Sequence, residues 1–279
     1  MRPGGGRGGR RRAGAGVLLA AVASAILTAC PSPQSALYPA PPPRPIEPLA
    51  GGQVVEFEVA EGRTGYALHH PAPASSPTLV FFHGNGDQVA HLTWLGGALA
   101  ERGLGFYAIE YPGYGPASAQ SVSEAAIYET AEAALGHLRD RLGVPNERTV
   151  LMGQSLGTGV AAEMATRGFG SRIVLLSPYT SVPDLADRLF SRPVGSLITD
   201  SFDTKAKAAG IDVPVLIAHG ARDNMIPIEM ARELDATFPR SQLHVLGAAG
   251  HNDVWRVGGA AWLERIDRFA RGGAKGASS

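Results

Sequence analysis

The chain has 279 residues, which is enough for one good-sized domain with appendages. Its formal net charge is zero and 18% of its residues are charged, so the overall charge gives no indication of a nucleic-acid or acidic partner. A single cysteine excludes an intramolecular disulfide and a zinc site built from cysteines.

Residues 1–29 have the pattern of a secretory signal peptide. Five arginines and no acidic residue precede an apolar run at residues 17–27. This run is shorter than the roughly 20 residues of a membrane-spanning helix, and an uncleaved membrane anchor is the alternative. A twin-arginine signal fits poorly, because residues 13–16 after the arginines depart from that pattern.

The end of this segment, LTAC at residues 27–30, resembles the lipobox of bacterial lipoproteins. The resemblance implies cleavage before Cys30 and acylation of that cysteine. The protein would then be lipid-anchored in the bacterial cell envelope, with its soluble domain outside the cytoplasm. Residues 30–50 are expected to form a tether, because residues 31–48 contain eight prolines and favour an extended spacer. A proline-rich ligand for a partner is the alternative.

Residues 51–270 read as one domain of alternating strands and helices. Alternating hydropathy predicts a half-buried strand at residues 53–59, with residues 65–69 as its hairpin partner. Further strands, most of them apolar runs typical of strands buried on both faces, are expected at residues 78–82, 106–109, 149–152, 173–176, 213–218 and 243–246. Helices are expected at residues 89–102, 123–142, 156–166, 228–238 and 260–270.

This alternation predicts an α/β fold with a mostly parallel central sheet and helices on both faces. In such sheets the functional site forms at the carboxyl ends of the strands. Residues 271–279 are rich in glycine, alanine and serine, and we expect them to be a disordered tail.

The sequence Gly153-Gln154-Ser155-Leu156-Gly157 joins an apolar run to a helical one. Taken alone, Gly-x-Ser-x-Gly is a weak signal in a glycine-rich chain, and a serine that only caps the helix is the alternative. A strand–turn–helix is, however, the setting that a nucleophilic serine requires. Glycines let strand and helix approach closely, and the helix N-terminus favours negative charge. We therefore expect Ser155 to be a nucleophile.

A nucleophilic serine needs a base and an orienting acid. Asp223 and His251 each follow the carboxyl end of a predicted strand, at the edge of the sheet where Ser155 is also expected. We expect His251 to take and return the Ser155 proton, and Asp223 to orient the imidazole. Asp184 is a weaker candidate for the acid. His83 and His219, which each precede a glycine, are expected to shape the loops around the site.

The oxyanion formed during attack needs two hydrogen-bond donors. We expect one to be the backbone N–H of Leu156, which follows the nucleophile, and the other that of Asn85 in the loop HGNGD. This loop is not a phosphate-binding loop, because the Lys-Ser/Thr ending is absent.

Five stretches of the sequence carry a resemblance to a known family: FFHGNGD, EYPGYGPAS, MGQSLGTG, LLSPYTSV and VLIAHGARDNMIP. Together they resemble the α/β-hydrolase superfamily over about residues 54–270. They resemble the α/β-hydrolase-domain proteins that include protein depalmitoylases and related bacterial esterases or peptidase-like hydrolases. The resemblance implies serine hydrolase chemistry without a metal or organic cofactor. Glu110 stands where such proteins often have Asp, and Pro116 follows the YPGYG turn. We expect only a small cap near residues 182–190, with Tyr179 and Phe190 as candidate lining residues.

The favoured function is a membrane-tethered serine hydrolase that cleaves carboxylic esters or thioesters through an acyl-enzyme on Ser155, and its partner is a small-molecule or acylated substrate. One alternative is a peptidase-like amide hydrolase, which needs an acidic anchor and has only Asp87 or Glu110 nearby. Another is a non-catalytic binding module, which the three triad residues argue against. Neither the natural substrate nor the oligomeric state follows from the sequence.

Overall fold

The computed structural model describes residues 37–272. The chain divides into two compact units, Met1–Pro39 and Ala40–Ser279, and the fold below is that of the second unit. The predicted signal peptide, Cys30 and residues 273–279 of the predicted tail lie outside the described residues. Within the described part of the chain, no helix is both long enough and apolar enough to cross a membrane.

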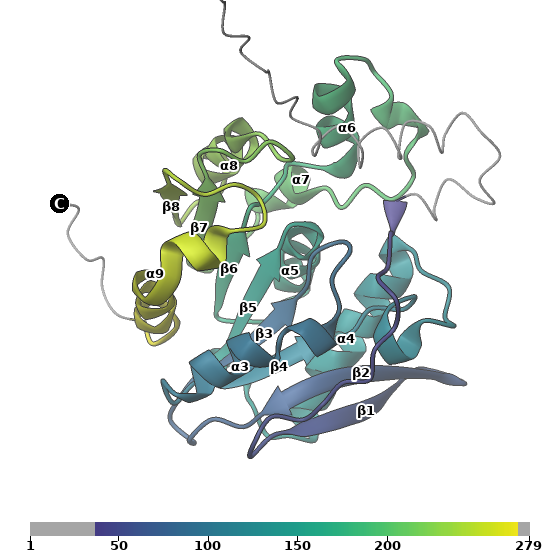
Figure 1. The fold of residues 1–279 in the computed structure, drawn as a ribbon, viewed down its shortest axis with the longest axis vertical. Helices are drawn as coiled ribbons and strands as arrows, with labels where there is room; N and C mark the ends of the chain where they lie inside the picture. The colour runs from purple at the N-terminus through teal and green to yellow at the C-terminus, as the bar shows by residue number, and fades with distance from the viewer. Residues whose placement is uncertain (1–36, 273–279) are drawn as a thin grey trace, which may run out of the picture. The chain divides into compact units, whose positions relative to one another are not determined.

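An eight-stranded sheet forms the centre of the fold (Figure 1). Its spatial order is β1-β2-β4-β3-β5-β6-β7-β8. The β1–β2 and β2–β4 pairs are antiparallel, whereas all other neighbours are parallel. The strands are β1 (Gln53–Ala60), β2 (Arg63–His70), β3 (Thr78–Phe82), β4 (Gly105–Ile109), β5 (Thr149–Gln154), β6 (Arg172–Leu176), β7 (Val215–Gly220) and β8 (Ser241–Leu246). The predicted mostly parallel sheet is confirmed.

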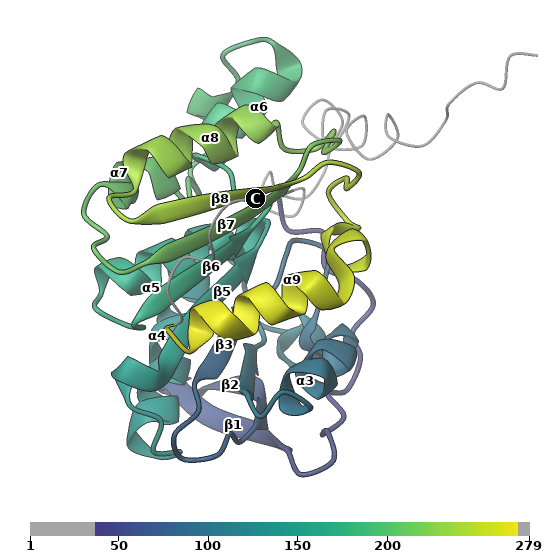
Figure 2. The ribbon, with the colours of Figure 1, turned by 90° about the vertical axis from the view of Figure 1, so that its left-hand side faces the viewer.

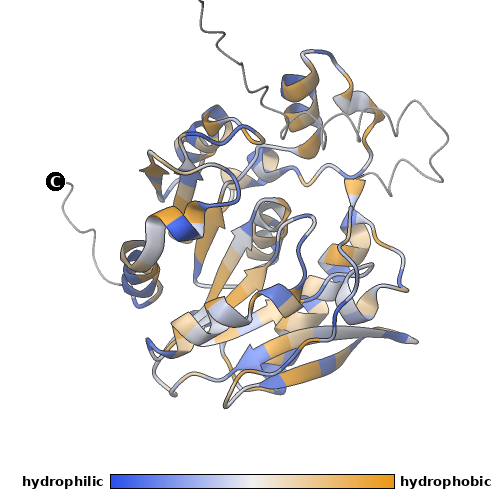
Figure 3. Ribbon diagram, viewed as in Figure 1, coloured by the Kyte–Doolittle hydropathy of each residue, from blue (hydrophilic) through white to orange (hydrophobic). Residues whose placement is uncertain are grey.

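Helices cover both faces of this sheet (Figure 2). One face carries α3 (Thr93–Ala100) and α9 (Val254–Ala270), while the other carries α4 (Glu124–Asp140), α5 (Leu156–Thr166) and α8 (Ile228–Thr237). Because of this double cover, all residues of β3 and β4 are buried, as continuous apolar strands require. Figure 3 shows the apolar residues concentrated along the central strands.

Local sequence signals account for several element boundaries. In β1, Val55 and Phe57 are buried between exposed neighbours, which is the predicted half-buried pattern. The Ser123 hydroxyl accepts a hydrogen bond from the N–H of Ala126 at 3.2 Å and so caps α4, as expected. The strand that was expected to begin at Val213 begins at Val215 and runs on to Gly220.

Two expected helices differ from the structure. The segment expected as one helix over residues 89–102 is a 3₁₀ turn, η1 (Val89–His91), followed by α3, because the backbone at Leu92 departs from helical geometry. The last helix begins at Val254 rather than at residue 260. It bends at Gly259, whose φ of 49° and ψ of −143° are non-helical. Glycine adopts such angles readily, and so the pattern shows a helix only after this kink.

The cap is small, as expected, but contains more than one element. It consists of α6 (Val182–Phe190) and η4 (Gly195–Leu197), and α7 (Thr204–Ala208), which follows, packs against α5 and α8 of the main domain. The Glu124 carboxylate at the start of α4 accepts hydrogen bonds from the backbone N–H groups of Ser201 (2.6 Å) and Phe202 (2.9 Å). The returning end of the cap is therefore attached to the main domain by a charged group.

Candidate active site

Ser155 occupies the turn between β5 and α5 in a strained conformation. Its φ of 50° and ψ of −117° are rare for a residue with a side chain. Its N–H donates to the Leu176 carbonyl at 2.9 Å, which ties the turn to β6. The hydroxyl makes no capping hydrogen bond to α5, so Ser155 is not a simple helix cap.

The two flanking glycines are required by this turn. A Cβ at Gly153 would lie 2.2 Å from the Gly157 carbonyl oxygen, and a Cβ at Gly157 would lie 2.0 Å from the Phe82 carbonyl oxygen. Neither position can hold a larger residue without backbone movement. The close approach expected from the sequence is present on both sides of Ser155.

The structure brings Ser155, Asp223 and His251 into one hydrogen-bonded line. His251 Nε2 lies 3.0 Å from Ser155 Oγ, and His251 Nδ1 lies 2.7 Å from Asp223 Oδ2. The Asp223 side chain is fully buried, and that of His251 is 6% exposed. These distances are those of a nucleophile, a base and an orienting acid in their usual order.

Two loops with shared hydrogen bonds hold the acid and the base. Asp223 follows β7, and His251 lies between β8 and α9. The N–H of Arg222 donates to the Ala249 carbonyl at 2.9 Å, which joins one loop to the other. A Cβ at Gly220 would lie only 2.4 Å from the Ala249 oxygen. The spacing between Asp223 and His251 is therefore set by backbone contacts.

The environment of Asp223 favours its ionised form. Oδ1 accepts hydrogen bonds from the N–H groups of Met225 and Ile226, both at 2.9 Å. Burial acts to raise the pKa of this carboxyl, but the hydrogen bond and charge of His251 and these two N–H donors outweigh it. The pKa of Asp223 therefore lies below its usual value. A carboxylate held in this way can stabilise an imidazolium at His251.

Leu156 directly follows Ser155, and the loop that carries Asn85 approaches the serine. Leu156 is the first residue of α5, whose opening N–H groups have no acceptor within the helix. The loop after β3 also approaches the serine, since a Cβ at Gly84 would lie 3.4 Å from Ser155 Cβ. Asn85 follows in this loop, and its Oδ1 accepts a hydrogen bond from the Tyr114 hydroxyl at 2.8 Å. The Asn85 side chain thus anchors the loop.

Beneath this loop lies a buried polar cluster that the sequence did not reveal. His83 Nε2 and Glu110 Oε1 are 3.1 Å apart and fully buried, close enough for a charge interaction although not aligned as a hydrogen bond. Glu110 Oε2 also accepts from the Val89 N–H at 3.2 Å, and the Tyr111 hydroxyl donates to the His83 carbonyl at 3.0 Å. A Cβ at Gly115 would lie 2.3 Å from Glu110 Oε2, so the long glutamate side chain fits only because Gly115 is there.

Other residues singled out from the sequence lie elsewhere. Asp184 pairs with Arg188 at 3.0 Å within α6, whereas the carboxylate that contacts the His251 ring is that of Asp223. Tyr179 is 2% exposed, and its hydroxyl donates to the Leu156 carbonyl at 3.3 Å. Tyr179 therefore supports the start of α5 rather than lining an open site, which corrects that expectation.

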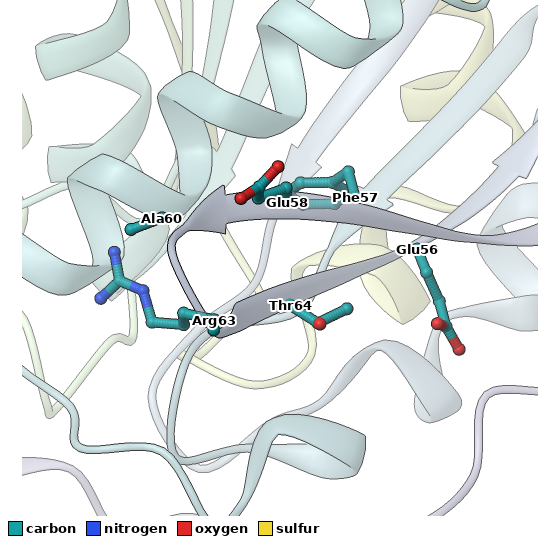
Figure 4. Close-up of a pocket in the computed structure, with 7 residues that line it drawn as sticks. Glu56, Phe57, Glu58, Ala60, Arg63 and Thr64 are labelled. Carbon is teal, nitrogen blue, oxygen red and sulfur yellow. The ribbon is translucent and has the colours of Figure 1, made fainter.

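A shallow depression lies at the β1–β2 hairpin, lined by residues that include Glu56, Glu58, Arg63 and Thr64 (Figure 4). The side chains of Glu56, Glu58 and Arg63 point in different directions and do not converge. Since β1 is the edge strand and β5 lies four positions along the sheet, this depression is separate from Ser155. Among residues 37–272, no cluster of three or more histidine, cysteine or acidic side chains could hold a metal ion.

Comparisons with known proteins agree with this fold. A model described as the alpha/beta hydrolase family matches residues 79–203, and one described as the alpha/beta hydrolase fold matches residues 197–256. A Mycobacterium tuberculosis (strain CDC 1551 / Oshkosh) protein is 28% identical over 260 residues, covering 90% of this chain and 92% of that protein.

Human alpha/beta hydrolase domain-containing protein 17B is 33% identical over 203 residues, which cover 71% of this chain and 67% of that protein. This chain spans 61% of the Caenorhabditis elegans relative aho-3 and 64% of the mouse relative 17C. Among solved structures, the Pyrococcus furiosus esterase Pf2001 has a TM-score of 0.67 at 17% identity, covering 82% of this chain and 97% of that one, a likeness of fold. The chain therefore belongs to the alpha/beta hydrolase family.

Proposed function

We propose that this hydrolase cleaves carboxylic esters or thioesters through an acyl-enzyme on Ser155. The supporting observation is the continuous line from Asp223 Oδ2 through the His251 ring to Ser155 Oγ, with separations of 2.7 and 3.0 Å. Neutral His251 donates its Nδ1 proton to Asp223, which leaves Nε2 as the acceptor for the serine proton.

The reaction would run in two halves. Ser155 Oγ attacks the carbonyl carbon of the substrate while His251 Nε2 takes its proton, and the N–H groups of Leu156 and Asn85 stabilise the oxyanion. Collapse of this intermediate breaks the bond to the alcohol or thiol, which leaves with the proton from His251. A water molecule then attacks the acyl-enzyme while the same imidazole takes its proton. The bond from the acyl carbon to Ser155 Oγ breaks, the carboxylic acid is released, and His251 returns the proton to Ser155.

The surroundings of Ser155 suit an apolar group on the substrate. The indole N–H of Trp255 donates to the Gln154 side chain at 2.9 Å, next to the serine. Trp94 packs edge-on against Trp255, with ring centroids 5.5 Å apart, and remains 50% exposed. Met225, two residues after Asp223, is 37% exposed. Exposed tryptophan next to a reactive centre favours contact with an acyl chain or an apolar alcohol.

Geometry favours esters over amides with a charged terminus. An aminopeptidase-like site needs a free acidic anchor, and both acids near the oxyanion loop already contact other groups of the protein. Asp87 Oδ1 lies 2.9 Å from His91 Nδ1 and accepts a hydrogen bond from the backbone N–H of Gln88, also at 2.9 Å. Glu110 is fully buried. Turnover of an aminoacyl arylamide above that of a short acyl ester would support the amide alternative.

A fluorophosphonate probe together with an ester panel graded by acyl length tests the proposal. We expect the wild-type protein to be labelled and Ser155→Ala to be unlabelled and inactive. Ser196→Ala, an exposed serine in η4, is the matched control and should behave as wild type. Labelling that persists in Ser155→Ala would contradict the assignment of Ser155 as the nucleophile. A silent probe and no turnover across the panel would favour a binding module.

We also propose that Cys30 is acylated and tethers the enzyme to a membrane of the cell envelope. The support is the LTAC sequence at residues 27–30, followed by the proline-rich segment. In a bacterial host, Cys30→Ser should accumulate as a precursor and lose the lipid label that wild type carries. Processing and lipid labelling identical to wild type would exclude this anchor.

A further inference from the structure

A second histidine lies against the candidate acid. His219 belongs to β7 and is fully buried, and its Nε2 is 3.5 Å from Asp223 Oδ2, the same oxygen that His251 Nδ1 contacts at 2.7 Å. His219 makes no contact with Ser155 in the relay described above.

The hydrogen bonds of His219 close a ring around the acid. Its Nε2 lies 3.0 Å from the carbonyl oxygen of Ile226, and the N–H of the same Ile226 donates to Asp223 Oδ1 at 2.9 Å. Ile226 is thus held on its carbonyl side by His219 and on its N–H side by Asp223. Movement of Ile226 would rotate the carboxylate and change the angle at which Oδ2 meets His251.

The partner atoms decide the protonation of His219. A carbonyl oxygen only accepts hydrogen bonds, so Nε2 must carry the proton that Ile226 receives. Burial lowers the pKa of His219 and keeps the ring neutral, although the Ile226 carbonyl and Asp223 act in the opposite direction. Nδ1 then carries a lone pair, and it has no hydrogen-bond partner among the residues that the structure describes.

We propose that His219 is a positioning residue for the reaction: its Nε2–H holds the Ile226 carbonyl and faces Asp223 Oδ2, so that the carboxylate stays aimed at His251. This proposal rests on the serine hydrolase function proposed above. His219 touches neither substrate nor nucleophile, and it acts through Asp223.

Two substitutions of His219 by amide side chains separate the contribution of the Nε2 hydrogen bond from that of side-chain volume. The glutamine amide of His219→Gln can reach the position of Nε2, whereas the shorter amide of His219→Asn reaches only that of Nδ1. We expect His219→Asn to lower kcat for p-nitrophenyl butyrate and the rate of fluorophosphonate labelling by about tenfold, with KM within about twofold. His219→Gln should stay within about threefold of wild type.

His244→Asn is the matched control, because His244 lies on β8 and its ring stacks on Trp262. It should leave kcat unchanged. If folded His219→Asn has the kcat of wild type, or if His219→Gln is impaired as strongly, the proposal is wrong. Circular dichroism and thermal melting establish that each variant is folded.

A measurement on the wild-type protein does not depend on the variants folding. The ¹⁵N and ¹³C chemical shifts of the imidazole should show His219 as the neutral Nε2–H tautomer at pH 7. An Nδ1–H tautomer or an imidazolium would overturn the proposal. Wild-type ester turnover and labelling of Ser155 test the enzymatic function independently of either result.

Discussion

Two loops lie beside the same serine, and a His-Gly dipeptide stands where each meets its buried strand: His219-Gly220 ends β7, and His83-Gly84 follows β3. At the end of β7, His219 binds the Ile226 carbonyl in the loop that follows and faces Asp223. In the loop after β3, His83 lies against Glu110, which comes from the segment after β4. The acid of the first loop is held by backbone N–H groups of that loop, whereas the second loop depends on side chains from another part of the chain.

This difference follows from the groups that each loop presents. The β7 loop carries a charged side chain, and short-range N–H donors satisfy a carboxylate well. In the proposed mechanism, the β3 loop would present backbone N–H groups to the substrate, and these groups could not also support the loop. The same dipeptide therefore performs two different structural tasks, and the predictions below separate them.

The largest expected effect is on the acid of the β7 loop. Asp223→Asn should lower kcat by about 1,000- to 10,000-fold, because the amide no longer stabilises the imidazolium of His251. Stability should change by less than about 1 kcal/mol, since the remaining Oδ1 still accepts the two backbone N–H groups. Ester kinetics measure kcat, and urea unfolding measures stability. Asp212→Asn, a change at an exposed residue, is the control. Turnover near that of wild type would remove Asp223 from the relay.

Glu110→Ala tests the opposite behaviour in the β3 loop. It leaves His83 and the Val89 N–H without their buried partner, so the free energy of unfolding should fall by about 3 kcal/mol. We expect kcat to fall as well, because the oxyanion loop loses support. Glu56→Ala, on the exposed side of β1, should leave unfolding unchanged within about 0.5 kcal/mol. If Glu110→Ala is as stable as wild type, the β3 loop does not depend on this side chain.

His69, a buried histidine outside both loops, gives a pH dependence of stability with which the two loops can be compared. Burial, together with the nearby charges of His70 and His137, lowers the pKa of His69 to about 4. The unfolded chain takes up this proton near pH 6.5, so stability is retained above that pH and is lost as the pH falls towards 4. Between pH 7 and pH 5 this residue should destabilise wild type by about 2 kcal/mol.

His69→Gln should remove that part of the acid sensitivity, as urea unfolding at the two pH values can show. If the variant loses as much stability as wild type between pH 7 and pH 5, the acid sensitivity originates at other groups. His219, whose pKa is also lowered by burial, is the first of these to examine.

The smallest effect is expected at the hydroxyl that anchors Asn85. Tyr114→Phe removes the 2.8 Å hydrogen bond to Asn85 Oδ1 and should cost about 1 kcal/mol of stability, with a decrease in kcat of about threefold. Tyr107→Phe is the matched control, because the Tyr107 hydroxyl is buried without a hydrogen-bond partner among residues 37–272. It should be neutral or slightly stabilising. Equal behaviour of the two variants would show that Asn85 needs no such anchor.

Short-range patterns in the sequence predicted part of this fold. The central strands, the cap of α4 by Ser123 and the turn at Ser155 each depend on neighbouring residues, and the structure has them where they were expected. The kink at Gly259 and the break at Leu92 were missed, because glycine angles and a single non-helical residue leave no trace in hydropathy. The catalytic roles of Ser155, Asp223, His251, Leu156 and Asn85 stay predictions, as does the role of Cys30.

The sequence by itself determined the α/β fold and the turn that presents Ser155, because strand periodicity and two close glycines act over a few residues. Chain order also placed Asp223 and His251 at the correct edge of the sheet, since parallel strands all end there. Only the tertiary structure decided which polar groups meet: His83 with Glu110, and His219 with Ile226 and Asp223. Contacts between elements depend on distances of a few ångströms across the fold, which spacing along a chain does not specify.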